Sequence, residues 1–470
     1  MCRRRLRSFS QIALHPSHLI CSCSLFAVRR VRRASQRRAT AIGDARILFT
    51  NGTGKAQIHD VVRPVLAGQR TDKKREEVAF FIFSAQHRHL TSESMKSDSL
   101  GQLILTGVPT PCLDPETEKL FRRIQPGGFI LFTRNIESAA QLRKLSDDLR
   151  SLSVVEPIIT IDQEGGRVSR LRLIGNEPPN AQQLRDTNDV DLIRRHGDIT
   201  GRLLRLFGFN LDLCPVLDIS FDDEADNSLR GRCYGKTVEQ VVENAGAFNE
   251  AMRGQGIASC GKHFPGYSAA TVDAHHDLPK IERTRAELDQ EELAVFRAFI
   301  GSDGPPGRPT NLVDSMMTCH GWYPCFEPTR TPATLSHRVV TELLREELGF
   351  DGLIMTDDLD MGAILNEYGL DETIRLAIAA GNDLAMICHR IPEIDNVHRI
   401  LARLPRDQID RGLASVTRFK EKLAPPDKFS EAAFRKIDSE IWDLRVAVLG
   451  EERARQRSPE DAKRSPVEMY

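Results

Sequence analysis

The sequence predicts an α/β fold in which eight parallel strands, each followed by a helix, close into one barrel. Two observations predict it. After residue 95, short apolar runs alternate with longer amphipathic stretches, a pattern typical of parallel strands linked by helices. Polar side chains also follow most of these runs directly, and a barrel of this kind carries its reactive groups at those positions.

The apolar runs give the strand count that a closed (β/α)8, TIM-type barrel requires. Several of the amphipathic helix candidates between the runs begin at an Asp, Ser or Thr cap and end at Gly, as helix ends prefer. An open, doubly wound sheet is the alternative, but the strand count and the lack of a Gly-rich dinucleotide motif disfavour it. The expected strands are 102–107, 128–132, 157–161, 210–216, 257–261, 315–319, 352–356 and 383–387, and the helix candidates include 113–124, 138–152, 191–208, 238–256, 285–300 and 337–349.

Three segments of the chain differ in composition. Residues 1–94 carry 18 Lys/Arg against 6 Asp/Glu, although the whole chain has a net charge of −1. Because this segment has no steady periodicity, we expect a disordered or non-native extension, with the native chain starting at Met95. An Arg-rich targeting or membrane-surface arm is the alternative. Residues 95–430 form the predicted barrel domain, and residues 431–470 a helix followed by a frayed polar tail.

The overall composition is that of a soluble globular protein. Hydrophobic residues make up 40% and charged residues 28% of the chain, so we expect neither a nucleic-acid nor a membrane partner. Ten cysteines are scattered without a C-x-x-C pair, which disfavours a disulfide framework or a zinc site. We therefore expect reduced thiols, no metal and no other cofactor.

Polar residues directly follow most of the expected strands. In a barrel these positions share one rim, and the loops at that rim form the large pocket. A single strand-end charge is more often a helix cap or an ion-pair partner, whereas a full set indicates an active site. The set comprises Arg134, Asp162, Lys262 with His263, His320, Asp357 with Asp358, and His389.

Seven sequence blocks, in order, resemble glycoside hydrolase family 3 and specifically its single-domain bacterial β-N-acetylglucosaminidases (β-N-acetylhexosaminidases). The similarity spans residues 100–395. The blocks are GGFILFTRN at 127–135, IDQEGGRVSRL at 161–171, GRCYG at 231–235, GKHFPGYSAATVDAHHDLP at 261–279, MTCH at 317–320 with Tyr323-Pro324, PATLS at 332–336, and LGFDGLIMTDDLDMGAI at 348–364.

The resemblance implies a retaining glycosidase that releases terminal, non-reducing β-linked N-acetylglucosamine. It implies that the substrates are peptidoglycan (muropeptide) fragments and that the enzyme acts in cell-wall recycling in the cytoplasm. We expect a monomer whose partner is this carbohydrate. Two alternatives remain: a β-glucosidase of the same family, which usually takes its acid/base from an additional domain, and a sugar-binding protein that has lost turnover.

Retention of anomeric configuration requires a carboxylate close to the anomeric carbon. By its place in the MTDDLDM block, the resemblance assigns this nucleophile to Asp357. The alternative is that Asp357 caps the following helix and that Asp358 reacts.

The second catalytic group first donates and later accepts a proton. The resemblance assigns it to His275, paired with Asp273, because the family's N-acetylglucosaminidases use a His and an Asp on a mobile loop. An adjacent carboxylate favours the imidazolium and raises the pKa of the histidine. His276 or His263 is the alternative. Such an acid/base does not repel an anionic acceptor, so phosphorolysis by phosphate is a secondary hypothesis.

The same blocks imply sugar-binding roles for five charged side chains. Sugar hydroxyls need charged, fork-like partners that orient the ring. Structural ion pairs are the alternative role for each of them. These residues are Asp162, Arg170, Arg232, Lys262 and His263.

The chain departs from the usual family pattern beside the predicted acid/base. After KHFPG the family commonly has His-Gly, whereas this chain has Tyr267-Ser268. In the Asp-Ser-His motif of the family, Ala274 replaces the serine in this chain. The replacement of the family's glycine by Ser268 predicts a stiffer catalytic loop.

Overall fold

The computed structural model describes residues 99–224, 228–270, 273–274, 277–301 and 312–458. The chain divides into two units, Met1–Gln86 and His87–Tyr470, and every described residue belongs to the second unit. The extension over 1–94 and the start at Met95 lie outside the described residues and stay predictions.

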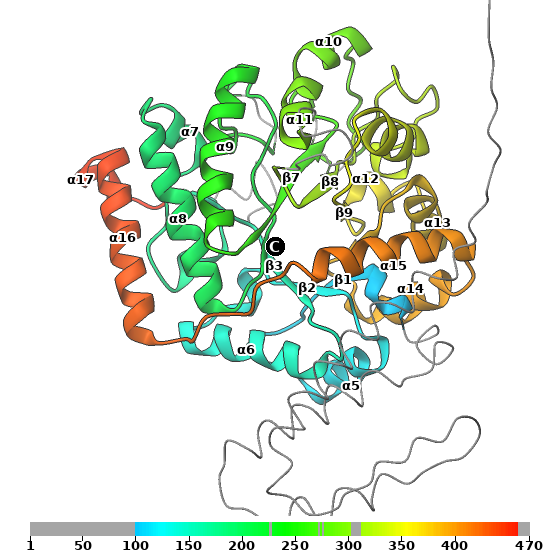
Figure 1. Ribbon diagram of the computed structural model, residues 1–470, viewed down its shortest axis with the longest axis horizontal. Coiled ribbons are helices and arrows are strands. Elements are labelled where there is room, and N and C mark those ends of the chain that lie inside the picture. Colours follow the sequence, from blue (N-terminus) through cyan, green and yellow to red (C-terminus); the bar gives the residue numbers. More distant parts are fainter. Residues whose placement is uncertain (1–98, 225–227, 271–272, 275–276, 302–311, 459–470) are drawn as a thin grey trace, which may run out of the picture. The chain divides into compact units, whose positions relative to one another are not determined.

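Eight parallel strands close into a barrel, as the sequence predicts (Figure 1). The first strand pairs with the last, with Ile104 opposite Ala385, which closes the sheet and excludes the open, doubly wound alternative. Each strand falls on one of the expected runs. The barrel strands are β1 (Ile104–Gly107), β2 (Gly128–Ile130), β3 (Ile158–Ile161), β6 (Leu211–Asp212), β7 (Ala258–Phe264), β8 (Ser315–Thr318), β9 (Leu353–Asp358) and β10 (Leu384–Ile387).

Local signals set the helix ends. The Asp114 carboxylate accepts the N–H groups of Glu116 and Thr117, both at 3.0 Å, and so caps the first helix of the barrel. Gly208, at φ 87°, ends the longest helix before β6. The described helices are α5 (Pro115–Ile124), α6 (Ala139–Leu152), α7 (Ala181–Arg185), α8 (Val190–Phe207), α9 (Val238–Gly254), α10 (Arg285–Gln290), α11 (Glu292–Ile300), the π-helix η7 (Arg338–Glu347), α12 (Gly362–Leu365), α13 (Leu370–Ala380), α14 (Ile394–Leu401), α15 (Arg406–Lys420), α16 (Glu431–Leu449) and α17 (Glu451–Ala454), with short 3₁₀ segments between them.

The structure adds detail that periodicity did not predict. The helix expected over 285–300 is broken at Glu291, whose backbone leaves the helical region at φ −119°, ψ −88°. A small antiparallel hairpin, β4 (Gln163–Gly165) with β5 (Val168–Ser169), follows β3. This hairpin brings the 161–171 block back over the end of the barrel.

The prediction of a frayed tail is wrong up to Ser458. Helix α16 packs along α8 (Figure 1), and its buried Arg445 donates to the carbonyl oxygens of Ala454 (2.7 Å) and Glu177 (2.9 Å). Ser458 Oγ in turn donates to Glu177 Oε1 at 2.7 Å. The segment folds back because a buried guanidinium needs acceptors on several sides.

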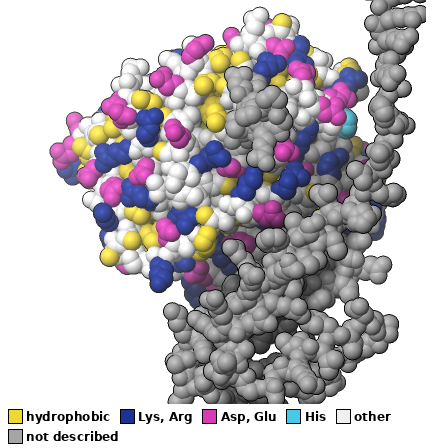
Figure 2. Space-filling model, viewed as in Figure 1, with side chains coloured by type: hydrophobic (Ala, Val, Ile, Leu, Met, Phe, Trp, Pro, Cys, Tyr) yellow, Lys and Arg dark blue, Asp and Glu magenta, His cyan; other side chains and the backbone are white. Residues whose placement is uncertain are grey.

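The described surface and thiols agree with the composition. Basic and acidic side chains are interspersed on the face shown in Figure 2. The seven described cysteines form no disulfide with one another, and all but Cys112 and Cys325 are buried. Within the described residues, no helix is long and apolar enough to cross a membrane.

One buried side chain compensates for the shortness of β6. Asn210, which is fully buried, accepts the Ile159 N–H at its Oδ1 (2.8 Å) and donates its Nδ2 to the Pro157 carbonyl (2.9 Å). Its amide thus supplies pairing between β3 and β6 that two ladder residues alone do not provide. Buried backbone groups require such partners.

We predict that Asn210→Ala lowers the free energy of unfolding by about 2–4 kcal/mol, because it leaves two buried backbone groups unpaired. Urea denaturation followed by circular dichroism measures the loss. Asn396→Ala is the matched control, since the half-buried Asn396 on α14 makes no side-chain hydrogen bond to the described residues. Its change stays within about 0.5 kcal/mol. An equal loss in both variants would contradict the role of Asn210.

Candidate active site

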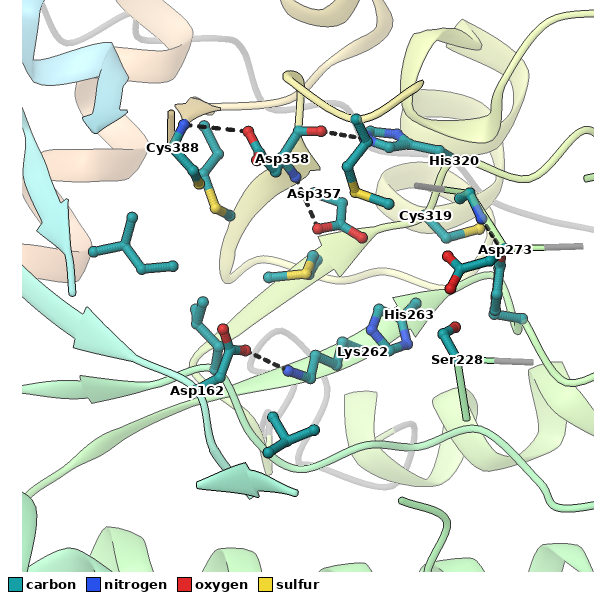
Figure 3. Close-up of a pocket in the computed structure, with 18 of the residues that line it drawn as sticks. Asp162, Ser228, Lys262, His263, Asp273, Cys319, His320, Asp357, Asp358 and Cys388 are labelled. Carbon is teal, nitrogen blue, oxygen red and sulfur yellow. Dashed lines mark hydrogen bonds and ion pairs between the residues drawn. The ribbon is translucent and has the colours of Figure 1, made fainter. Parts of the chain in front are cut away.

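A pocket opens at the carboxyl ends of the barrel strands. Its empty volume is about 740 Å³, including open solvent at its mouth. Asp162, Lys262, His263, Asp273 and Asp357 all line it (Figure 3). Side chains from four separate parts of the sequence therefore meet at one site.

A charged cluster forms one wall of this pocket. Lys262 Nζ lies 2.7 Å from Asp162 Oδ1 and 2.7 Å from Glu164 Oε1. Arg232 holds Glu164 with two hydrogen bonds of 2.7 Å, from Nε and from a terminal nitrogen. Arg170 lies 3.5 Å from the second oxygen of Asp162. The cluster joins β7, the β4–β5 hairpin and the turn at 228–232.

Mutual pairing keeps this cluster ionised. Burial opposes the charge of Lys262, but Asp162 and Glu164 overcome it and raise the pKa of the ammonium above its ordinary value. Burial also favours neutral Asp162 and Glu164, yet the facing cations lower the pKa of both carboxyls. The wall therefore presents fixed charges, which suits the orientation of sugar hydroxyls.

His263 is held by a carboxylate that the sequence analysis did not select. Its Nδ1 lies 2.7 Å from Asp218 Oδ2, and its backbone N–H donates to the same oxygen at 3.2 Å. Its Nε2 lies 3.5 Å from Arg232. A carboxylate beside Nδ1 favours the tautomer that carries hydrogen on that atom. Asp218 thus fixes the orientation of the imidazole.

Asp357 and Asp358 are neighbours with different surroundings (Figure 3). Asp357 lines the pocket, and its Oδ1 accepts the N–H of Asp358 at 2.8 Å. The Asp358 carboxylate accepts the N–H groups of Asp360 (3.0 Å) and Cys388 (3.2 Å) and lies 3.2 Å from His389 Nε2. Asp358 therefore ties β9 to the end of β10.

The predicted acid/base pair is described only in part. Asp273 lines the pocket and is 8% exposed. His275 lies outside the described residues, as does its alternative His276, so their roles stay predictions.

Of the other predicted rim residues, His320 and His389 line the pocket and Arg134 lies beside it. His320 lies 2.8 Å from the Asp358 carbonyl through Nε2 and 3.1 Å from Thr334 Oγ1 through Nδ1. Arg134 does not line the pocket; it donates to the Cys388 carbonyl at 2.7 Å and lies 3.2 Å from His389 Nδ1. Within the described ranges, no group of three or more His, Cys, Asp or Glu side chains could hold a metal ion.

Sequence reasoning missed Glu164 and Asp218. Glu164 lies in the same block as Asp162, and an acidic residue inside that motif was an available signal. Asp218 is a lone acid in the apolar stretch LCPVLDIS, and a fully buried carboxylate of that kind needs a partner. Which partner it meets depends on the turn after β7, far along the chain.

Comparison with known proteins agrees with this architecture. The sequence model described as "Glycosyl hydrolase family 3 N terminal domain" matches residues 95–419. A protein named β-hexosaminidase from Vibrio cholerae serotype O1 (strain M66-2) is 34% identical over 279 residues, 59% of this chain and 80% of that protein. A β-hexosaminidase from Pseudomonas aeruginosa (strain LESB58) is 33% identical over 278 residues, 59% of this chain and 79% of its own.

A solved structure shares the fold. It is a glycoside hydrolase family 3 β-N-acetylglucosaminidase from Paenibacillus sp. str. FPU-7, with a TM-score of 0.65 and 33% sequence identity, covering 74% of this chain and 68% of that one. The family match extends over more than half of the present chain. The chain is thus a glycoside hydrolase and belongs to family 3, as its seven blocks predict.

Proposed function

We propose that this chain is a retaining β-N-acetylglucosaminidase that releases terminal, non-reducing β-linked N-acetylglucosamine. The observation that carries the proposal is the placement of Asp357 in a pocket whose wall is the charged cluster around Lys262. The names of the family 3 relatives support the choice of sugar. A pocket at the end of a barrel also suits a terminal sugar of a glycan better than an internal one.

The contacts of the two adjacent aspartates favour Asp357 as the nucleophile. Both aspartates line the pocket, but Asp358 already binds two backbone N–H groups and the His389 ring, whereas Asp357 accepts the N–H of Asp358. In the first step, an Asp357 oxygen bonds to the anomeric carbon while the bond to the leaving oxygen breaks. His275 gives its proton to that oxygen.

The second step regenerates the enzyme. His275, now neutral, takes a proton from water, and the water oxygen bonds to the anomeric carbon as the ester to Asp357 breaks. Asp273 stabilises the imidazolium in both steps because a nearby carboxylate favours that form. Asp162, Arg170, Arg232, Lys262 and His263 orient the sugar hydroxyls through charge-assisted hydrogen bonds.

Water, rather than phosphate, is the proposed acceptor. Lys262 contacts two carboxylates, Arg232 is paired with Glu164, and Arg170 faces Asp162. Cations that are already neutralised attract a phosphate dianion weakly, and Asp357 and Asp273 add negative charge near the reacting carbon. We further propose that the natural substrates are peptidoglycan (muropeptide) fragments cleaved by a monomer in the cytoplasm, as the family resemblance implies.

The substrate is tested with two chromogenic glycosides. We expect hydrolysis of p-nitrophenyl β-N-acetylglucosaminide and at most weak hydrolysis of the matching β-glucoside, measured as kcat/KM. Preference for the glucoside would identify the β-glucosidase branch. Saturable binding of N-acetylglucosamine without release of nitrophenol would identify a sugar-binding protein instead.

The nucleophile is tested by substitution and labelling. Asp357→Ala is expected to abolish turnover, because the covalent path needs that carboxylate. A fluorinated, slow N-acetylglucosaminyl donor is expected to label Asp357, as read by peptide mass spectrometry of the inactivated enzyme. A label on Asp358 would overturn the assignment.

The acid/base is tested by varying the leaving group. His275→Ala is expected to lower kcat/KM for a phenyl glycoside by about 10²–10⁴-fold, the usual contribution of a positioned acid or base. A 2,4-dinitrophenyl glycoside needs no protonation, so its kcat/KM should change little. His276→Ala is the control in the same segment, and a larger effect there would move the role to His276.

A further inference from the structure

The turn that follows β7 is held from several sides. The N–H of Tyr267 donates to Asp218 Oδ1 at 2.6 Å, while the other oxygen of Asp218 binds His263. The Tyr323 hydroxyl donates to the Gly266 carbonyl at 2.5 Å. Tyr267 is 4% exposed and lines the pocket. The backbone of Tyr267 is therefore anchored to Asp218, the same carboxylate that orients His263.

Ala274 is bound through both of its backbone groups. Its N–H donates to the Tyr267 hydroxyl at 2.9 Å, and its carbonyl accepts the N–H of Ala363 at 3.0 Å. Ala363 lies in α12, a few residues after Asp357. Ala274 is 4% exposed and, like its neighbour Asp273, lines the pocket. The segment that carries Asp273 is thus tied both to the turn after β7 and to the strand end that carries Asp357.

The Tyr267 hydroxyl is suited to this contact over a wide pH range. Burial, with the Asp273 carboxylate nearby, raises the pKa of Tyr267 well above its ordinary value. The hydroxyl therefore stays protonated while its oxygen accepts the Ala274 N–H. The two positions that this hydrogen bond joins, 267 and 274, are among those at which the sequence departs from the usual family pattern.

We propose that Tyr267 is a positioning residue for general acid catalysis: its hydroxyl fixes Ala274, and through it Asp273, in the lining of the pocket. This inference rests on the proposed function, because it assumes that the segment after Asp273 delivers the proton. A side chain that is 4% exposed and bound at both its backbone and its hydroxyl restricts the segment more than a solvated one does. Proton transfer is sensitive to such placement, since donor and acceptor must come within hydrogen-bond reach.

The test compares Tyr267→Phe with the wild-type full-length chain on two substrates. Phenyl N-acetyl-β-glucosaminide needs a proton on its leaving group, and the 2,4-dinitrophenyl glycoside does not. We expect kcat/KM for the phenyl substrate to fall at least about tenfold, a part of the ~10²–10⁴-fold effect of a general acid. For the dinitrophenyl substrate, we expect kcat/KM to stay within about threefold, which also shows that the variant folds.

Ser268→Ala is the matched control. Ser268 is the next residue of the same turn, and its hydroxyl accepts the Ile219 N–H at 2.9 Å instead of contacting the Asp273 segment. We expect it to change the ratio of the two kcat/KM values by less than about twofold.

Each outcome of the comparison decides the role of Tyr267. Equal losses of Tyr267→Phe on both substrates, or no loss on either, would overturn the positioning role. The same selective loss in Ser268→Ala would assign the effect to the whole turn and would also overturn it. Failure of the proposed function looks different, because the wild-type chain would then hydrolyse neither N-acetylglucosaminide.

Discussion

The site depends on the burial of one ammonium group between two carboxylates. Lys262 is 2% exposed, and its Nζ lies 2.7 Å from both Asp162 and Glu164. A buried charge that loses its partner destabilises a fold by about 3–5 kcal/mol, so the elements that carry these groups must keep their places. Strand β7, the end of β3 and the β4–β5 hairpin are held in register by this requirement. Arg232 extends it to the turn at 228–232 through its two bonds to Glu164.

Two adjacent aspartates at the end of β9 differ because their surroundings differ. Asp358 stabilises the barrel by accepting N–H groups from its own loop and from the end of β10. Asp357 points to the cavity, with one backbone donor to orient it. Both side chains line the pocket, but the Asp358 carboxylate is held by its backbone donors and by the His389 ring. Environment, not residue type, thus separates a structural carboxylate from the proposed nucleophile, as it does wherever two carboxyl groups take different roles.

Asp218 connects the fixed cluster with the segment of Asp273. One of its oxygens binds His263 and the other binds the N–H of Tyr267, whose hydroxyl holds Ala274. A displacement of the turn after β7 therefore moves both the His263 ring and the Asp273 segment. This connection makes the positions of His263 and Asp273 depend on each other.

The barrel, its eight strands and the strand ends that line the pocket could all be predicted from the sequence. Apolar periodicity and the strand-end position of Asp162, Lys262 and Asp357 are local properties, so one stretch of sequence suffices to recognise each of them. Ordered motifs then identified the family. Sequence reasoning could not find four contacts that the folded chain makes: Glu164 with Lys262, Asp218 with His263, Arg445 with the C-terminal segment, and Tyr267 with Ala274. Each of these contacts joins groups from separate loops or helices, and their pairing depends on how the closed barrel brings its loops together in space.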